Sequence, residues 1–515
     1  MKNNKFYITT PIYYVNGDPH IGHAYTTIAA DIIARFNRML GKDTFLLTGS
    51  DEHGEKIMQA AAIDNMDPQA FVDKNSAKFE ITWDNLNISN DNFIRTTSKN
   101  HKLAVQKSLQ KLFDKGLIYK GEHNGLYCIG CEQYKTEKDL VDGLCSDHQK
   151  KPIEVKEDCY MFKLSVFRNI IKNKIETDEL QIKPEDKKNE VLSFLNEGLK
   201  DISFSRKIKW GVELPWDTTQ TAYVWPDAFL NYITGLDWNG EDKAPPMWPA
   251  EVQLMSKDII RVHATIWIAI LLGLELPLPK KLFVHGFFLV NGQKMSKSVG
   301  NVITPDDLLK NYGTDGTRYL LASATPFGHD GDISMDKFDL KYNADLANGI
   351  GNLVARSISL TKKMKDAGIK LSTNSFATNN SNQDTWGDQI FQHEIHSAWE
   401  DYKKNLDDLQ LDLSIRVVQE QISFLDNYIT TVKPWELIRD NNPKTGEVIY
   451  NILERIRHIA LMMLPFIPET ADKILSAISL DPEQEKQKGW ETFTKWGGLL
   501  TDAEIKESAI LFPRK

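Results

Sequence analysis

The sequence predicts an α/β protein whose parallel sheet is interrupted by an inserted domain and followed by a helical region. Three observations support this fold class. A strand, a helix and a second strand follow one another near the N-terminus, residues 117–216 differ in composition from their surroundings, and the chain beyond about Asp336 carries helical patterns almost throughout. Strand–helix–strand order over so few residues is typical of a βαβ unit with parallel strands.

The elements of the first unit can be placed in order from their patterns. Residues 6–10 are β-prone and precede a turn signal. An amphipathic helix begins at Ile21, because apolar residues recur at helical spacing as far as Phe36. Residues 44–48 then form a second buried strand, and helical patterns continue until Gly116.

The α/β pattern resumes after the insertion. We expect a strand at 252–255, a mostly buried helix at 259–272 and a strand or hairpin at 282–290. The helical region contains one Asn-, Ser- and Thr-rich tract, residues 371–383, which we interpret as a loop. The predicted domains are 1–116, 117–216, 217–335 and 336–515.

Composition limits the classes of function. The chain has 515 residues, which suggests about three domains. Its 62 basic and 71 acidic residues give a net charge of −9, so the overall basic footprint of a DNA-coating protein is absent and DNA is not an expected partner. A local basic track for another nucleic acid remains open.

Four cysteines are too few for a disulfide scaffold in a chain of this length. We find neither a leader-like apolar segment near the N-terminus nor an apolar run long enough to span a membrane. We therefore expect a cytoplasmic protein without membrane association, in which reduced cysteines bind metal more readily than they form disulfides.

Two short motifs carry the first chemical signal. His20-Ile21-Gly22-His23 lies at the start of the first helix, where unpaired N–H groups and the helix dipole favour phosphate. Gly22 allows close approach to the backbone, and the two imidazoles can donate hydrogen bonds. Taken alone, the motif could equally be two surface histidines near a helix cap.

Lys294-Met295-Ser296-Lys297-Ser298 follows a predicted strand in a loop flanked by glycines. Lysines on such a loop can neutralise a polyphosphate, although an isolated Lys-x-x-Lys is more often a solvated basic loop. The joint occurrence favours function. Together the two motifs resemble the signature pair of class I aminoacyl-tRNA synthetases.

The resemblance implies a Rossmann-type catalytic domain that activates an amino acid with MgATP and transfers it to tRNA. His20, Gly22 and His23 would bind ATP, and Lys297, helped by Lys294, would stabilise the transition state. No covalent enzyme intermediate is expected, so catalysis would rest on positioning and charge stabilisation.

Four further segments are similar to the methionyl-tRNA synthetase family. They are residues 10–17, 49–54, 223–228 and 257–263, and the similarity extends over nearly the whole chain. It implies that Asp51 holds the amino group of methionine. The residues implied for its side chain are Ile12, Tyr14, Trp225, Ala228, Tyr232 and His263. A polarizable thioether packs well against aromatic rings, although each aromatic taken singly could be ordinary core.

The insertion carries a third signal. Cys128-Ile129-Gly130-Cys131 and Cys145-Ser146-Asp147-His148 are two close ligand pairs, which is the spacing of a tetrahedral structural zinc site. We predict one Zn²⁺ held by Cys128, Cys131, Cys145 and His148, with reduced cysteines of no function as the alternative. Cys159 lies outside the pattern. An insertion of about 100 residues is also too short for the separate editing domain of larger relatives.

The helical C-terminal part would read the anticodon. Asn352 and Arg356 are four residues apart and so share a helix face, and Trp435 follows Pro434 at the expected start of another helix. The resemblance assigns Asn352, Arg356 and Trp435 to the anticodon of tRNA(Met), including the initiator tRNA. Packing and solvated surface are the alternative for such residues.

Taken together, these observations predict a Rossmann-type parallel-sheet catalytic domain that is split by a zinc-binding insertion and followed by an α-helical bundle. Its substrates would be methionine, ATP with Mg²⁺, and tRNA, and we expect a monomer. Other possibilities are another class I synthetase, for cysteine for example, a non-catalytic tRNA-binding paralogue, and a nucleotidylyltransferase with the same two motifs.

Overall fold

The structure is a computed structural model of the chain. It describes residues 4–129, 133–135, 140–145, 150–290, 292–295, 302–373, 388–506 and 510–515. Most of the predicted loop at 371–383 therefore lies outside the described residues. Among the described helices, none is long and apolar enough to cross a membrane.

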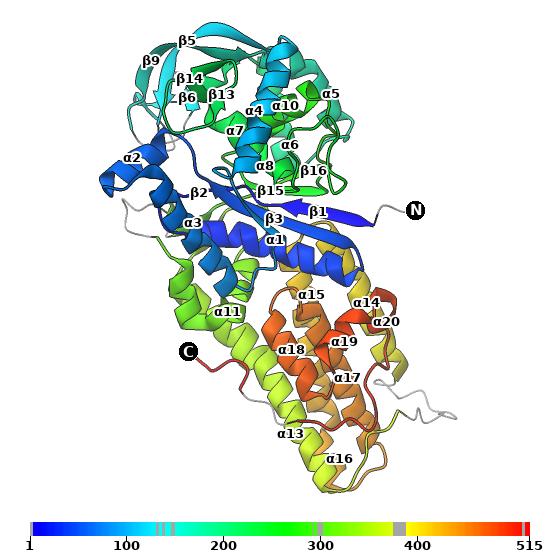
Figure 1. Cartoon of the computed structure of the whole chain (residues 1–515). Coiled ribbons are helices and arrows are strands. Elements are labelled where there is room, and N and C mark those ends of the chain that lie inside the picture. The colour runs from blue at the N-terminus through cyan, green and yellow to red at the C-terminus, as the bar shows by residue number, and fades with distance from the viewer. Residues whose placement is uncertain are drawn as a thin grey trace.

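A seven-stranded sheet runs through the upper half of the molecule (Figure 1), in the order β10–β16–β15–β1–β3–β2, with β4 also pairing with β3. Every described strand pair in this sheet is parallel, which confirms the predicted α/β class. Its strands are β1 (Lys5–Thr9), β2 (Tyr13–Tyr14), β3 (Asp43–Asp51), β4 (Asn92–Arg95), β10 (Gln181–Lys183), β15 (Val252–Ser256) and β16 (Lys281–His285).

The strand order reverses at β1. This strand pairs with β3 along one edge and with β15 along the other, so that Ile8 lies opposite both Leu46 and Val252. In open parallel sheets, ligands bind in the crevice outside the carboxyl ends of the strands at such a reversal. The helix α1 (Ile21–Met39) begins beyond the carboxyl end of β1, so its N-terminus faces this crevice.

Helices cover both faces of the sheet, as a buried parallel sheet requires. In Figure 1, α1 covers one face and α4, α8 and α10 the other. The helices of this part are α2 (Glu55–Ile63), α3 (Pro68–Asn85), α4 (Lys99–Asp114), α7 (Val224–Phe229), α8 (Asn231–Thr234), α9 (Ile260–Val262), the π-helix η3 (His263–Trp267) and α10 (Ile268–Gly273).

The insertion is built on a long antiparallel pair, β5 (Ile118–Cys128) and β9 (Ile153–Phe162), within a four-stranded sheet in the order β11–β9–β5–β6. The insertion is not a wholly separate unit. Strand β10, which follows β9 in the chain, pairs with β16 and extends the main sheet. The other elements of the insertion are β6 (Gln133–Lys135), β7 (Leu140–Val141), β8 (Leu144–Cys145), η2 (Leu164–Phe167), α5 (Arg168–Glu176), α6 (Glu185–Glu197), β11 (Ile202–Ser203) and β12 (Ser205–Arg206).

The described residues also form two small three-stranded sheets. One has the order β12–β14–β13 and the other β18–β17–β19. The strands concerned are β13 (Glu213–Leu214), β14 (Asp217–Ala222), β17 (Phe288–Val290), β18 (Gln293–Lys294) and β19 (Gly331–Ile333). The predicted strand or hairpin at 282–290 is thus divided between β16 and β17, which belong to different sheets.

The C-terminal part is helical, as predicted, and lies below the sheet in Figure 1. It follows α11 (Pro305–Ser323), which connects it to the catalytic half. Its helices are α12 (Met335–Lys341), the π-helix η4 (Tyr342–Gly351), α13 (Asn352–Asp366), α14 (Asp388–Asp407), α15 (Leu411–Val432), α16 (Pro434–Arg439), α17 (Thr445–Met463), α18 (Pro468–Ala477), α19 (Pro482–Gln487) and α20 (Trp490–Phe493).

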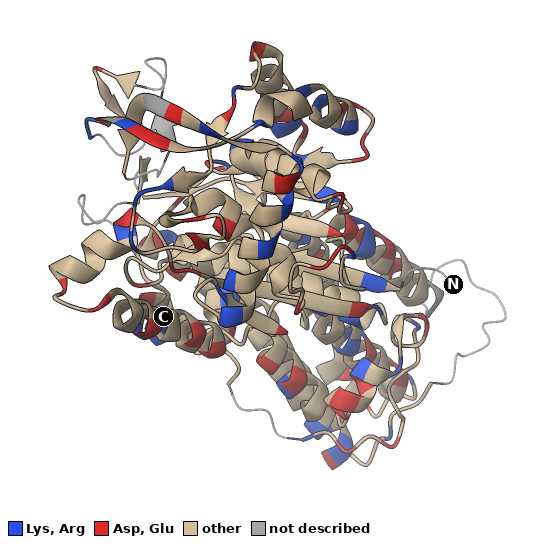
Figure 2. Ribbon diagram, turned by 45° about the horizontal axis from the view of Figure 1, so that its top comes forward, with Lys and Arg blue, Asp and Glu red and all other residues tan. Residues whose placement is uncertain are grey.

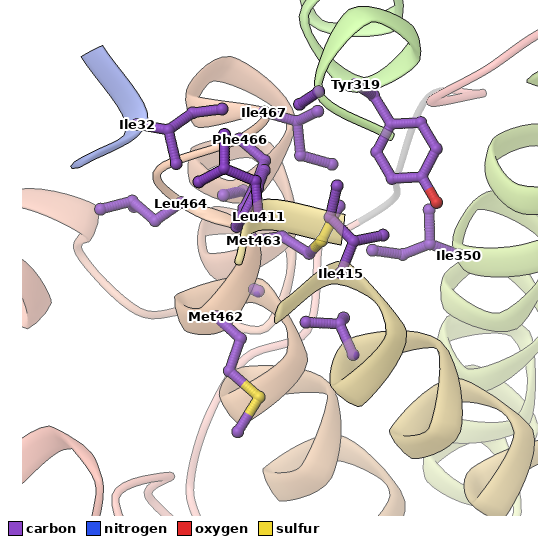
Figure 3. Packing of buried hydrophobic residues seen from close by; sticks show 14 of the residues in the cluster. Ile32, Tyr319, Ile350, Leu411, Ile415, Met462, Met463, Leu464, Phe466 and Ile467 are labelled. Atoms are coloured by element: carbon purple, nitrogen blue, oxygen red, sulfur yellow. The ribbon is translucent and has the colours of Figure 1, made fainter. Parts of the chain in front are cut away.

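One apolar core joins the sheet half to the helical part. Figure 3 shows Ile32 of α1 and Tyr319 of α11 in one cluster with five labelled side chains near the end of α17, namely Met462, Met463, Leu464, Phe466 and Ile467. These side chains are buried, and each buried large apolar side chain contributes about 1.5–3 kcal/mol. The two parts are therefore packed together rather than merely tethered.

A buried arginine also lies at this junction. Arg318 of α11 forms an ion pair of 2.6 Å with Asp31 of α1. It donates hydrogen bonds to the backbone oxygens of Leu86, Asn87, Pro465 and Phe466 at 2.8–3.2 Å. All five guanidinium N–H groups thus have acceptors, and the bonds tie α1 and α11 to the turn between α17 and α18.

Candidate active site

A cavity of about 590 Å³ opens at the crevice predicted by the strand order. Its lining includes every residue that the sequence assigned to ATP or methionine and whose side chain the structure describes. These are Ile12, Tyr14, His20, Gly22, His23, Asp51, Trp225, Ala228, Tyr232 and His263. The structure thus brings together residues from both sides of the insertion, while their individual roles stay predictions.

The first turn of α1 differs from the expectation of unpaired N–H groups. His20 is the N-cap, and its ring rather than a ligand completes the cap. The backbone donors Ile21, Gly22, His23 and Ala24 are bonded to Ile303 O, His20 Nδ1, His20 O and His20 O respectively. The expectation is wrong for this helix, because the protein itself satisfies the first-turn donors.

The two imidazoles of this turn carry N–H groups of their own. Gly22 N–H donates to His20 Nδ1 at 3.1 Å, and His20 N–H donates to His23 Nδ1 at 3.4 Å. Since each Nδ1 accepts a hydrogen bond from a backbone N–H, the N–H of each neutral ring is at Nε2. The rings stack with centroids 3.6 Å apart at the cavity wall. A Cβ at Gly22 would lie 3.0 Å from two atoms of the His20 ring, so glycine leaves room for this arrangement.

Tyr13 supports His23 from behind and was not among the predicted residues. Its hydroxyl donates to His23 O at 3.3 Å and shares a 2.7 Å hydrogen bond with Thr27, and its ring lies 4.8 Å from the His23 ring. Burial raises the pKa of Tyr13 to about 12, so the hydroxyl stays protonated. Sequence reasoning missed Tyr13 because its place in the 10–17 segment does not reveal which way the side chain points.

The opposite end of the cavity is aromatic. Tyr232 Oη lies 2.8 Å from His263 Nε2, and His263 Nδ1–H donates to Ile259 O at 2.8 Å. This fixes Nε2 as the acceptor and the tyrosine as the donor. Burial lowers the pKa of His263 to about 4, so the ring is neutral at physiological pH.

Phe229 completes this wall. Its ring stacks on Trp225 at 5.4 Å and meets the His263 ring edge-on at 4.8 Å. It follows Ala228 on α7, so its position next to a predicted residue was the available signal. The lining also contains unpredicted polar residues, among them Asn231, Ser256, Asp258 and His285.

Asp51 ends β3 and is 6% exposed at the cavity wall. The next residue, Glu52, is anchored away from the cavity: Arg95 Nε donates to its Oε1 at 2.6 Å and Ser50 Oγ donates at 2.7 Å. Burial opposes ionisation of Glu52, but the hydrogen bonds from Arg95 and the neighbouring hydroxyls lower its pKa below the ordinary value. The backbone that carries Asp51 is therefore firmly held.

The described residues on both sides of the predicted Lys297 border the same cavity. Lys294 ends β18, whose backbone pairs with β17, whereas Lys297 lies outside the described residues. Met295 before the undescribed stretch and Thr304 after it both line the cavity. Ile303 O accepts the N–H of Ile21, so the returning chain is bonded to the first turn of α1.

Half of the predicted zinc set can be placed. Cys128 ends β5 and Cys145 ends β8, and both are buried. Cys131 and His148 lie outside the described residues. Among the residues that are described, no three His, Cys, Asp or Glu side chains are grouped as a metal site. Buried thiols at the ends of short hairpins fit the donor chemistry of zinc, and the four-ligand set stays a prediction.

A second candidate site lies at the far end of the bundle. The Arg356 guanidinium lies 5.4 Å from the centroid of the Trp435 ring, and its Nη1 lies 3.8 Å from Asp426 Oδ1. Asn352 precedes Arg356 by one turn of α13. Trp435 is 39% exposed although it is large and aromatic, so its ring is accessible to a stacking partner. In Figure 1, α13 and α16 reach the end of the molecule opposite the sheet.

The reversed parallel sheet, the His20–His23 motif and Met295 of the second motif at one cavity, and the distant helical end define a class I aminoacyl-tRNA synthetase. Residues 6–151 and 131–358 match the family described as tRNA synthetases class I (M), and residues 380–501 match the anticodon binding domain of methionyl tRNA ligase. The chain belongs to the methionyl-tRNA synthetase family.

Two curated relatives and one solved structure support the assignment. The methionine–tRNA ligase of Clostridium acetobutylicum is 39% identical over 100% of this chain and 78% of its own length. That of Rickettsia conorii is 40% identical over 99% of both chains. Among solved structures, Mycobacterium tuberculosis methionyl-tRNA synthetase in complex with methionyl-adenylate is 34% identical, covers 99% of each chain and has a TM-score of 0.91.

Proposed function

We propose that this protein activates L-methionine with ATP to give methionyl-adenylate and transfers the methionyl group to the 3′ end of tRNA(Met). The observation that carries the proposal is the single cavity in which the His20–His23 cap faces the aromatic wall of Trp225, Tyr232 and His263. Such a cavity can hold the phosphates of a nucleoside triphosphate at one end and an apolar side chain at the other.

In the first step, the methionine carboxylate attacks the α-phosphate and pyrophosphate leaves. Nε2–H of His20 and of His23 would donate to the phosphate oxygens, and the positive end of α1 would favour the same anion. Lys294 and Lys297 would neutralise charge that develops in the transition state. Mg²⁺ bound with ATP would supply further charge neutralisation on the phosphates.

Methionine would be held at both of its ends. Asp51 would accept hydrogen bonds from the ammonium group. The thioether would contact Trp225, Ala228, Phe229, Tyr232 and His263, with Ile12 and Tyr14 on the opposite side. A neutral His263 suits this role, because a charged imidazolium would make the pocket less favourable for the uncharged side chain of methionine.

The helical part would select the tRNA. Trp435 would stack on an unpaired base, while Arg356 and Asn352 would reach base edges or phosphate. Acidic and basic residues are interspersed over the whole ribbon (Figure 2), so a net charge of −9 leaves room for local contacts with RNA. We extend the proposal to initiator tRNA, and to a structural Zn²⁺ held by Cys128, Cys131, Cys145 and His148.

The test is the amino-acid dependence of ATP–pyrophosphate exchange. We expect methionine to support exchange and cysteine not to, and we expect transfer to tRNA(Met) in the presence of ATP. Exchange driven by cysteine would establish a different class I synthetase. Binding of tRNA without any exchange would indicate a non-catalytic paralogue, and exchange that depends on no amino acid and leads to no transfer to tRNA would indicate a nucleotidylyltransferase.

A further inference from the structure

A buried carboxylate lies between two imidazoles just outside the cavity. Asp227 Oδ2 is 2.7 Å from His53 Nδ1, and its Oδ1 is 3.0 Å from His101 Nε2. The other ring nitrogen of His101 is 2.7 Å from Thr234 Oγ1. These residues are all at most 3% exposed, and none of them lines the cavity. The group therefore cannot touch a substrate bound there.

The network joins the two halves of the catalytic domain. His53 follows β3 and His101 belongs to α4, both before the insertion, whereas Asp227 and Thr234 belong to α7 and α8 after it. The insertion separates these halves by a long stretch of chain, so the contact is a tertiary one that the sequence order does not supply.

Asp227 and His53 each lie close in sequence to residues of the cavity wall. His53 is two residues from Asp51, and its backbone oxygen accepts the Tyr14 hydroxyl at 2.6 Å. Asp227 stands between Trp225 and Ala228 on the short helix α7. A shift of His53 relative to Asp227 would therefore move the predicted ammonium site relative to the predicted side-chain wall.

The hydrogen bonds that His53 and His101 donate to Asp227 make this contact rigid. Burial opposes ionisation of Asp227, but the two histidines lower its pKa below the ordinary value, so the carboxylate is charged. A charged carboxylate that accepts one N–H on each oxygen makes strong hydrogen bonds in a low-dielectric interior. Removal of either donor would leave a buried charge with fewer partners, and the flanking loop would be free to relax.

We propose that Asp227, bridged to His53 and His101, is a positioning residue that sets the distance between Asp51 and the Trp225–Ala228 wall and thereby the fit of methionine. The inference rests on the proposed function. It concerns the amino-acid end of the cavity, so the ATP end at His20 and His23 should be little affected.

The experiment measures KM for methionine and KM for ATP in pyrophosphate exchange, together with the midpoint of thermal unfolding. Asp227→Asn and His53→Ala should raise KM for methionine about tenfold or more and change KM for ATP less than about twofold. His53→Asn places an amide N–H near the former Nδ1–H and should stay within about threefold of wild type.

A matched control is available in the helical part. Glu454 is also a fully buried carboxylate, bonded to Arg457 and to the backbone N–H groups of Gly497 and Leu499. Glu454→Gln should lower the unfolding midpoint and leave both KM values unchanged.

Three results would overturn the proposal: equal changes of the two KM values, His53→Asn as impaired as His53→Ala, or variants that lose only stability, as Glu454→Gln does. If Asp227→Asn does not fold, the two His53 variants carry the test. A wild type without methionine-dependent exchange would count against the proposed function, whereas an active wild type with unaltered variants would count against the positioning role alone.

Discussion

The imidazole rings around the cavity take their tautomers from the backbone groups beside them. Nδ1 of His20 and of His23 accepts a backbone N–H, whereas Nδ1 of His263 donates to a backbone oxygen, as that of His285 does to Gly286 O. Nε2 is consequently a donor at one end of the cavity and an acceptor at the other. The sequence revealed where these histidines stand, but tautomers depend on backbone partners that only the folded chain provides.

A pH prediction follows from the buried His263. Its pKa is about 4 in the folded chain and about 6.5 in an unfolded one, so the unfolded state binds more protons between these values. The stability that this residue supplies is present above about pH 6.5 and is lost as the pH falls toward 4. From pH 7 to pH 5 the loss is about 2 kcal/mol.

His263→Gln should therefore reduce the decrease in unfolding free energy between pH 7 and pH 5 by about 2 kcal/mol relative to wild type. Urea unfolding followed by tryptophan fluorescence at both pH values would measure it. An identical pH dependence in the two proteins would contradict a lowered pKa at His263.

At the scale of elements, the strongly patterned segments were the predictable ones. The helix at Ile21 and the strand at 44–48 were found because their apolar residues repeat with a clear period. The sequence did not show where residues 282–290 divide into two strands, because the division depends on a close steric contact. A Cβ at Gly286 would lie 2.2 Å from the backbone of His329. His329 is distant from Gly286 in sequence, so no local sequence pattern predicts this contact.

The cavity shows the same limit. Motif residues such as His20, Asp51 and Trp225 could be named from the sequence, since they stand in recognisable segments. Phe229 and Tyr13 could not, because their roles depend on which face of a short element meets the cavity. The extra strand β10 was missed for a related reason: its partner β16 follows it by about one hundred residues.

The first turn of α1 gives a prediction that separates stability from activity. Gly22→Ala adds a methyl group 3.0 Å from the His20 ring and should displace that ring, which lowers kcat for exchange about tenfold to a hundredfold. Stability should not fall with it, because alanine favours a helix by about 1 kcal/mol over glycine. Exchange kinetics and thermal unfolding measure the two effects, and a parallel loss of both would contradict this account.

At the scale of the whole molecule, the sheet half and the bundle share one apolar core and are joined by one buried arginine. Arg318 lies at their junction, with Asp31 on one side and the backbone oxygens of Pro465 and Phe466 on the other. Loss of this guanidinium would leave Asp31 and several backbone oxygens buried with fewer donors.

Arg318→Met should lower the free energy of unfolding by about 3–5 kcal/mol, the usual cost of breaking a buried pair from one side. Arg38→Met is a suitable comparison, because Arg38 pairs with Asp91 at the surface and should cost at most about 1 kcal/mol. Urea unfolding of the three proteins would measure both values. Equal effects of the two substitutions would show that the junction does not depend on Arg318.

The capped first turn of α1 has a genetic consequence. A phosphate site made of backbone N–H groups survives nearly every substitution, because each residue except proline brings the same donor. Here those donors are already bonded within the protein, and the remaining N–H groups belong to two side chains, His20 and His23. A change in a single codon can therefore delete one of these donors, so the proposed phosphate end of the cavity should be unusually sensitive to mutation.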